Sequence, residues 1–334
     1  MYTSIYTADM PILLDQLSNT KDMQRLANVG MHCGCEYSNV PQYRQSKHSY
    51  TRLIHSIGVA KIIWHFTKDM KQTVAGLLHD IATPVFAHTI DYMNNDHEAQ
   101  ENTEKNTLSF IKGSKEISLL LEKHNIAFDE ICNCYQYPIA DNATPMLSAD
   151  RLEYTLGNGY IFNRLSLDQI ERIFSNLTVT INEHGAQEIC FSTVQNAKMF
   201  VDVSLKNSHF FMSNENRFLM QYLADIIRDA IEAGIISYAD LFSTESEVIK
   251  KLKTYKASAV GWHRRAKTAS VVASKEKIHD SYCVKVFTKK RFIDPLVLID
   301  CSAKRYSEID VQYKTELSSL LSLSFNHWLY VVES

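Results

Sequence analysis

A helical repeat of apolar residues, extending from about residue 10 to residue 240, restricts the fold more than any other feature. In the segment 48–67, Leu53, Ile57 and Ala60 recur at the spacing of one helix face. Similar spacing predicts helices at 71–79, 84–93, 194–208 and 215–233, and another that begins at Ser148. The chain has only 10 glycines and 6 prolines in 334 residues, less than half of the average share of about 12%. The predicted fold is therefore predominantly α.

Two regions depart from the helical pattern. The segments 177–181 and 188–191 alternate like strands around a turn at 182–185, which predicts a β-hairpin inserted into the helical core. Near the end of the chain, 282–287, 292–299 and the apolar run 328–332 also resemble strands. We therefore expect a helical core over residues 1–245 and a small α+β portion over 246–334, with the boundary between 245 and 280.

Charge, hydropathy and cysteine content exclude several classes of protein. The formal net charge is only −3, so the whole chain has no basic excess of the kind that binds nucleic acid. No apolar run approaches 18 residues, and residues 1–10 lack the basic and apolar regions of a signal peptide, so we expect a soluble cytoplasmic protein without a membrane partner. Seven cysteines, an odd number, indicate thiols rather than a disulfide framework. The pairs Cys33/Cys35 and Cys132/Cys134 lack the usual zinc-finger spacing.

Two imidazoles and two carboxylates stand out as a candidate metal site within residues 48–155. His55 lies in one predicted helix, His79 and Asp80 end the next, and Asp150 lies in the first turn of a third. Nitrogen and oxygen ligands of this kind suit one divalent ion, such as manganese, iron, cobalt, zinc or magnesium. Such an ion lowers the pKa of bound water towards ~7 and offsets charge on phosphoryl oxygens. The pattern therefore indicates hydrolysis of a phosphoester or phosphoanhydride.

The order and spacing of these residues resemble those of the HD-domain phosphohydrolases, whose motif is H…HD…D. Within that superfamily the chain is most similar to the deoxynucleoside triphosphate triphosphohydrolase (dGTPase-like) branch. The resemblance covers residues 20–160 well and extends more loosely to about 240. The matching segments are 23–26, 52–60, 75–81, 84–91, 97–98 and 150–154.

The resemblance implies a role for each matching residue. It implies that His55, His79, Asp80 and Asp150 are the four metal ligands. His88 would protonate the leaving oxygen, and Asp91 and His97 would order the attacking water. His88 and Asp91 are three residues apart, so a helix beginning at Pro84 would place them on one face. Arg52, Arg151 and Tyr154 match residues that hold the phosphates and the sugar.

One position departs from the triphosphohydrolase pattern. Those enzymes carry a histidine four residues after the aspartate of the His-Asp pair, whereas this chain reads Thr83-Pro84 in that region. Thr83 is a suitable N-cap for a helix that has proline at its first position. The segment 81–83 also lacks the acidic residues found in alarmone hydrolases, and the Gly-Tyr-Pro signature of cyclic-dinucleotide phosphodiesterases is missing.

Three interpretations of the activity follow. The first is hydrolysis of a nucleotide, above all release of triphosphate from a deoxynucleoside triphosphate. The second is another HD-type nucleotidase or phosphodiesterase. The third is a regulator that retains the metal site to sense nucleotides or that binds nucleic acid through the basic stretch 262–291. Similar enzymes assemble as oligomers, so a homo-oligomer is also expected.

Overall fold

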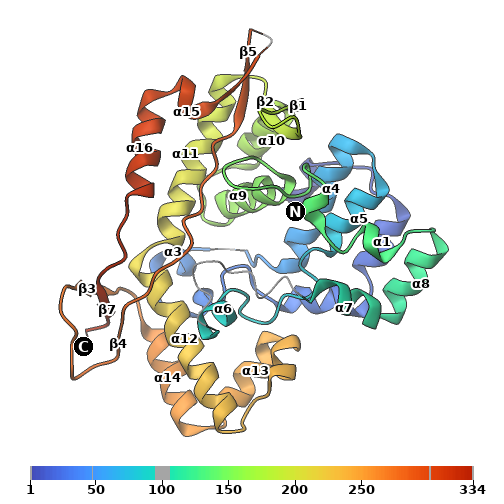
Figure 1. Ribbon diagram of the computed structural model, residues 1–334. Coiled ribbons are helices and arrows are strands. Elements are labelled where there is room, and N and C mark those ends of the chain that lie inside the picture. Colours follow the sequence, from blue (N-terminus) through green and yellow to red (C-terminus); the bar gives the residue numbers. More distant parts are fainter. Residues whose placement is uncertain (1, 47, 95–105, 301, 333–334) are drawn as a thin grey trace.

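The computed structural model describes residues 2–46, 48–94, 106–300 and 302–332, and confirms a predominantly α fold with a hairpin and a small α+β portion (Figure 1). The α-helices are α1 Ile12–Ser18, α2 Lys21–Arg25, α3 Pro41–Arg44, α4 Arg52–Thr67, α5 Met70–Leu78, α6 Thr89–Met93, α7 Thr107–Gly113, α8 Lys115–Lys123, α9 Ala149–Ile161, α10 Leu167–Ser175, α11 Val194–Phe211, α12 Asn214–Glu232, α13 Glu245–Leu252, α14 Lys256–Lys267, α15 Tyr306–Ile309 and α16 Val311–Leu321. Short 3₁₀ helices span Tyr2–Ile5, Leu26–Asn28, Cys35–Tyr37, Phe128–Glu130, Cys134–Gln136 and Tyr238–Phe242.

Two small sheets complete the secondary structure. The first has the order β1-β2-β5-β6, where β1 is Leu177–Ile181, β2 is Gln187–Phe191, β5 is Leu296–Ile299 and β6 is Ser302–Arg305. The predicted hairpin is confirmed as β1 and β2, but β2 also pairs in parallel with β5. The second sheet has the order β3-β7-β4, with β3 at Val272–Ser274, β4 at Cys283–Val284 and β7 at Trp328–Tyr330. The hairpin thus joins the C-terminal strands in one sheet.

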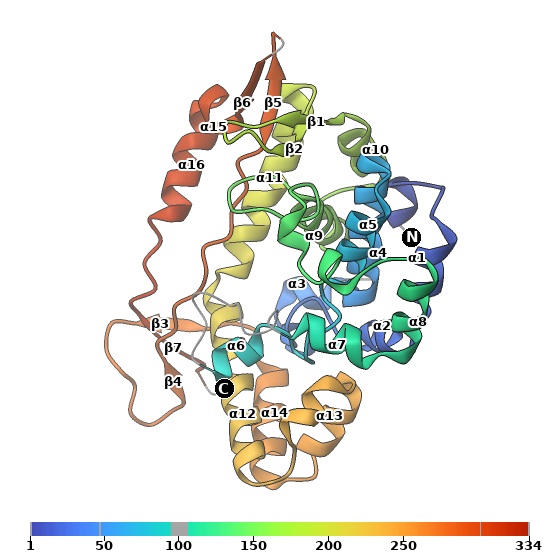
Figure 2. The ribbon, with the colours of Figure 1, turned by 45° about the vertical axis from the view of Figure 1, so that its right-hand side comes forward.

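Helix α4 forms the centre of the helical core. It packs against both α5 and α9, α9 packs against α11, and α12 packs against α6 and α14 (Figures 1 and 2). Two glycines allow the close approach of α4 to its neighbours. A Cβ atom on Gly76 of α5 would lie 2.1 Å from Cδ1 of Ile63, and one on Gly58 of α4 would lie 2.6 Å from Cγ of Glu153 on α9. The side chains of α4 therefore reach the end of α5 and the start of α9.

Side-chain caps determine where these three helices begin. The hydroxyl of Thr51 accepts a hydrogen bond from the backbone N–H of Ile54 at the start of α4. Asp69 caps α5 in the same way, and Ser148 caps α9 by accepting from the N–H of Arg151. Such caps satisfy N–H groups that have no partner within the helix. They place the sequence-predicted metal ligands at the second turn of α4, just beyond α5 and in the first turn of α9.

The predicted helix at 84–93 is wrong in its first half. Helix α6 begins only at Thr89, because Phe86 and Ala87 adopt positive φ angles of 60° and 41°, which interrupt a right-handed helix. Thr83 consequently caps no helix. Its hydroxyl donates instead to the Asp80 carboxylate at 2.8 Å. His88 is the N-cap residue of α6.

The C-terminal strands are shorter than predicted. Of 282–287 only Cys283–Val284 forms a strand, and of 292–299 only Leu296–Ile299 does. Residues 285–295, here called the C-terminal strap, form neither helix nor strand. Figures 1 and 2 show this orange-red segment running along α11 between β4 and β5. Residues far apart in the sequence thereby meet along α11.

The structure also bears on the expectations about membrane-spanning helices and disulfides. Among the described residues, no helix combines the length and the apolar character needed to cross a membrane. Six of the seven cysteines lie in the described ranges, and all six are free thiols.

Candidate metal centre

Four side chains come together, from α4, from the turn directly after α5 and from the first turn of α9. The Nε2 atom of His55 lies 2.9 Å from Oδ1 of Asp150 and 4.0 Å from Oδ2 of Asp80, and Nε2 of His79 lies 3.6 Å from both carboxylates. Atoms that each bind a common ion at about 2.1 Å stand about 3.0 to 3.4 Å apart in octahedral or tetrahedral geometry. His55, His79 and Asp80 satisfy the requirements for a metal-holding group, and Asp150 adjoins this group through its 2.9 Å and 3.6 Å distances to the two histidines.

Hydrogen bonds orient these donors. Nδ1 of His79 donates to the carbonyl oxygen of Gly76 at 2.7 Å, so Nε2 is the nitrogen that faces the cluster. Arg52 donates to Oδ2 of Asp80 at 2.8 Å, while Thr83 holds Oδ1 of the same carboxylate. These partners fix the ring of His79 and the plane of the Asp80 carboxylate before any ion binds.

The electrostatics of the cluster favour added positive charge. Burial lowers the pKa of His55, but Glu153 and Asp150 outweigh that effect and raise the pKa to about 10. Burial raises the pKa of Asp80, but Arg52 and the two imidazoles outweigh it, so the pKa lies well below its ordinary value. The pKa of Asp150 is also lowered, because its bonds to the two histidines outweigh its burial. Both carboxylates are therefore ionised and attract a cation.

Glu153 is a residue that sequence reasoning missed. It is fully buried on α9, and its carboxylate lies 2.5 Å from Nδ1 of His55. The hydroxyls of Tyr2 and Tyr50 also donate to it, each at 2.5 Å. A carboxylate behind a ligating histidine holds the ring in place and raises its basicity. The available signal was its position three residues after Asp150, on the same side of a helix.

We expect Glu153→Gln to weaken metal binding by about 10- to 100-fold, the usual effect of removing such a carboxylate. The amide preserves the shape of the side chain but carries no charge to support His55. Titration calorimetry with Mn²⁺ measures the change. Glu171→Gln, an exposed glutamate on α10, is the matched control. Equal metal affinity in wild type and Glu153→Gln would contradict the assigned role.

A cavity of about 580 Å³ opens over the cluster. Its polar residues outside the cluster include His32, Arg52, Thr83, His88, Thr107, Asn133, Asp141, Tyr154, Asn158, Asn216, Thr288, Lys289 and Arg291. Its apolar and aromatic residues include Met31, Ile131, Tyr135, Phe211, Met212 and Met220. The cavity thus combines an ion-binding cluster with cationic and apolar lining residues.

His88 and Asp91 form a second pair beside the cavity. Nδ1 of His88 lies 2.9 Å from the buried carboxylate of Asp91, as predicted from their spacing, although α6 begins later than expected. Nη2 of Arg291 lies 3.3 Å from Nε2 of His88. These partners assign the neutral tautomer that carries its proton on Nδ1. Burial and Arg291 lower the pKa of His88, against the raising effect of Asp91. The predicted partner His97 lies outside the described residues.

The three predicted substrate-binding residues are placed differently. Tyr154 and Arg52 both line the cavity, and Arg52 also donates a hydrogen bond to Asp80. Arg151 is not among the described residues that line it. The Arg151 guanidinium donates to Oδ1 of Asn142 at 2.5 Å and lies 3.4 Å from Asp141. In this structure Arg151 therefore braces the loop before α9.

The basic stretch 262–291 forms no single surface. Arg265 is fully buried, where it donates to the carbonyl oxygens of Gly34 and Leu219. Lys289 and Arg291 line the cavity instead. Sequence reasoning had no local signal for this placement, because the strap lies far from the helical motif in the chain.

Comparison with known proteins places this site in context. Residues 52–143 match the HD domain family model. The chain is 27% identical over 293 residues to the uncharacterized protein YdhJ of Bacillus subtilis, covering 86% of this chain and 85% of that protein. It is 25% identical over 167 residues to the metal-dependent phosphohydrolase cns2 of Cordyceps militaris. That match covers 50% of this chain and 46% of the fungal protein, so the chain spans about half of its length.

Two solved structures share the fold. A hypothetical protein from Aquifex aeolicus matches with a TM-score of 0.63 at 18% identity, covering 96% of this chain and 93% of that chain. A phosphohydrolase from Bacteroides thetaiotaomicron matches with a TM-score of 0.64 at 15% identity and 97% coverage of both chains.

Proposed function

Because the chain carries an HD domain at residues 52–143, we propose that it is a metal-dependent phosphohydrolase that acts on a nucleotide. The observation that carries the proposal is the convergence of His55, His79, Asp80 and Asp150 at one cavity. The name of the Cordyceps militaris relative, a metal-dependent phosphohydrolase, supports the same reaction class.

The donor set fits one divalent ion. Two imidazole nitrogens and two ionised carboxylates offer charge and ligand type for manganese, iron, cobalt, zinc or magnesium. When bound, such an ion lowers the pKa of a water molecule and offsets negative charge on the phosphoryl group. His55 is held by Glu153, and Asp80 is held by Arg52 and Thr83, so the chain presents these donors in a fixed arrangement.

His88 is the group best placed to transfer a proton. It lines the cavity but is not a member of the metal cluster, and Asp91 accepts the hydrogen bond from its Nδ1. Asp91 would stabilise the positive ring when Nε2 also gains a proton. That Nε2 proton can then be given to the leaving oxygen, which is the role of a general acid.

The volume and the lining residues of the cavity favour a nucleotide as the substrate over a small phosphate ester. The cavity volume of about 580 Å³ falls within the 300–1,000 Å³ typical of small-molecule sites. Lys289 and Arg291 suit phosphate groups, and Phe211, Met212 and Tyr135 suit a base or sugar. A nucleotide carries both kinds of group in one molecule.

We propose deoxynucleoside triphosphates as the substrates and triphosphate as the inorganic product, on the resemblance of the helical motif to that branch. The chain departs from that branch at Thr83-Pro84, where it has no histidine. The Thr83 hydroxyl donates to Asp80, so it supports a metal-cluster residue and offers no imidazole to the cavity. This departure keeps another HD-type nucleotidase or phosphodiesterase as the alternative.

A substrate panel with product identification tests the proposal. Purified chain with Mn²⁺ is incubated with each dNTP, NTP and nucleoside monophosphate, and products are separated by anion exchange. We expect nucleoside and inorganic triphosphate from at least one dNTP. Stepwise release of single phosphates would favour the alternative hydrolase. If no compound is cleaved while nucleotides raise the melting temperature, a nucleotide-sensing role replaces the enzymatic one.

A further inference from the structure

We propose that Lys289 and Arg291 of the C-terminal strap form an anion-binding wall for the substrate phosphates that do not contact the metal cluster. This inference rests on the proposed function and deepens it, because it assigns a polyphosphate subsite to residues outside the HD domain. The HD domain match ends at residue 143. The strap reaches the cavity from a part of the chain more than 140 residues further on.

Alternate residues of the strap face opposite sides. Lys289 and Arg291 line the cavity, whereas the ammonium group of Lys290 donates to the backbone carbonyl oxygen of Leu321 at the end of α16. Lys290 thereby ties the strap to α16. Lys289 and Arg291 lie on the cavity side, so the placement is specific to these positions rather than a general property of a basic segment.

Arg291 lies among the groups proposed for the chemistry. Its guanidinium donates to Nε2 of His88 at 3.3 Å, and its charge adds to the effect of burial in lowering the pKa of His88. An incoming phosphate is a stronger acceptor than an imidazole nitrogen, and a guanidinium binds it in bidentate fashion. Arg291 therefore offers its N–H groups to the anion and leaves Nε2 of His88 free to carry the proton of a general acid.

Hydrogen bonds anchor the strap both before Lys289 and after Arg291. At its start, Arg217 of α12 donates to the carbonyl oxygen of Val286 at 2.6 Å. Beyond Arg291, the N–H of Asp294 donates to the carbonyl oxygen of Pro145 at 2.9 Å, and its carbonyl oxygen accepts from Arg305 at 3.0 Å. These bonds fix the path of the strap between α12 and the loop before α9.

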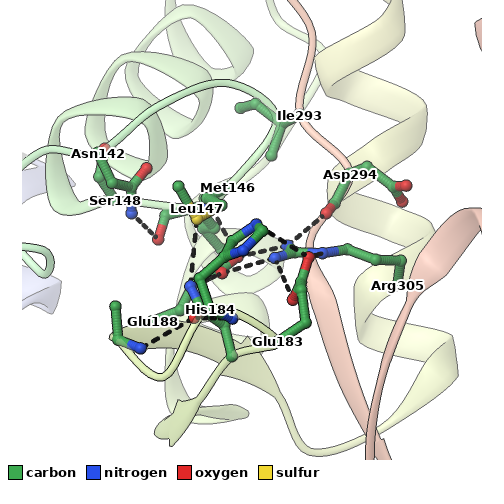
Figure 3. Close-up of polar contacts among 12 residues, drawn as sticks. Asn142, Met146, Leu147, Ser148, Glu183, His184, Glu188, Ile293, Asp294 and Arg305 are labelled. Carbon is green, nitrogen blue, oxygen red and sulfur yellow. Dashed lines mark hydrogen bonds and ion pairs between the residues drawn. The ribbon is translucent and has the colours of Figure 1, made fainter.

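Arg305 extends this anchor to the residues just before α9 (Figure 3). It makes a bidentate ion pair with the fully buried Glu188 of β2, at 2.6 and 2.8 Å. Glu188 in turn accepts from the N–H of Leu147, the residue before the N-cap of α9. Buried, fully bonded charge pairs of this kind hold a single geometry. The same network therefore positions the strap and the helix that carries Asp150.

Titration calorimetry with inorganic triphosphate tests the inference on the protein as purified. We expect Arg291→Ala to weaken triphosphate binding about 10-fold or more, since hydrogen bonds to charged groups are the stronger ones. Arg291→Lys should retain part of the affinity. Lys285→Ala removes an exposed strap lysine that is not among the cavity-lining residues, and it should leave binding unchanged. Inorganic phosphate, which has no second phosphate group for Arg291 beyond the one that would contact the metal cluster, should bind wild type and Arg291→Ala alike.

Three results would overturn the inference: no binding of triphosphate by wild type, equal binding by Arg291→Ala, or equal losses in Arg291→Ala and Lys285→Ala. These outcomes are independent of turnover. If dNTPs are hydrolysed while Arg291→Ala binds triphosphate normally, the subsite is wrong and the proposed function stands. If triphosphate binding depends on Arg291 while no nucleotide is hydrolysed, the subsite stands and the proposed function is wrong.

Discussion

His79→Ala is expected to lower the rate of nucleotide hydrolysis by about three orders of magnitude or more. The substitution removes one of four converging donors, and the Nε2 atom of His79 lies 3.6 Å from both carboxylates of the cluster. Loss of a bound ion removes several kcal/mol of transition-state stabilisation, and about 4 kcal/mol corresponds to a factor of about 1,000 in rate. Steady-state assays with the best dNTP measure the effect.

The fold should survive this substitution. Among the described contacts, His79 makes one hydrogen bond outside the cluster, to the carbonyl oxygen of Gly76, so the melting temperature should change by only a few degrees. His124→Ala, an exposed histidine at the end of α8, is the matched control and should retain full activity. Activity of His79→Ala within threefold of wild type would exclude a role for this cluster in catalysis.

His88→Gln is expected to lower kcat by about 10²- to 10⁴-fold, the usual contribution of a positioned general acid. Unlike the first substitution, it should leave metal binding intact, because His88 is not part of the metal-holding group. Glutamine retains an N–H donor for the buried carboxylate of Asp91, so the local structure should be preserved. Single-turnover kinetics and metal titration of the same preparation separate the two effects.

Comparison with His209→Gln, an exposed histidine on α11, controls for a general effect of the substitution. A normal kcat in His88→Gln would mean that another group protonates the leaving oxygen. Loss of metal together with activity would instead move His88 into the ion-binding cluster.

Local patterns in the sequence predicted the helical core, whereas the centre of the site was predicted with the help of a family resemblance. The spacing of apolar residues predicted where α5, α11 and α12 begin and end to within a few residues. It also predicted the end of α4, but α4 begins at Arg52 rather than at 48. The four ligands were predicted chiefly from the resemblance of His55, His79-Asp80 and Asp150 to the HD motif, and the structure places both histidines within 4.0 Å of a carboxylate of this set.

Contacts between distant parts of the chain were beyond sequence reasoning. Nothing in the sequence around Lys289 and Arg291 indicates that they line the same cavity as His55, and nothing near β2 predicts its parallel pairing with β5. Such placements depend on tertiary packing rather than on local propensity. The first half of the predicted 84–93 helix was wrong for a related reason. The positive φ angles of Phe86 and Ala87 prevent a helix from starting at Thr83-Pro84, although these residues resemble a helix start.

Metal content per chain is the most direct measurement of the central claim, that His55, His79, Asp80 and Asp150 bind one divalent ion. Wild type is incubated with manganese, iron, cobalt, zinc or magnesium, freed of excess ion by gel filtration and measured by elemental analysis. We expect about one ion per chain for at least one metal, with His124→Ala equal to wild type and His79→Ala close to zero. Retention of no ion by wild type, or equal retention by His79→Ala, would contradict the claim.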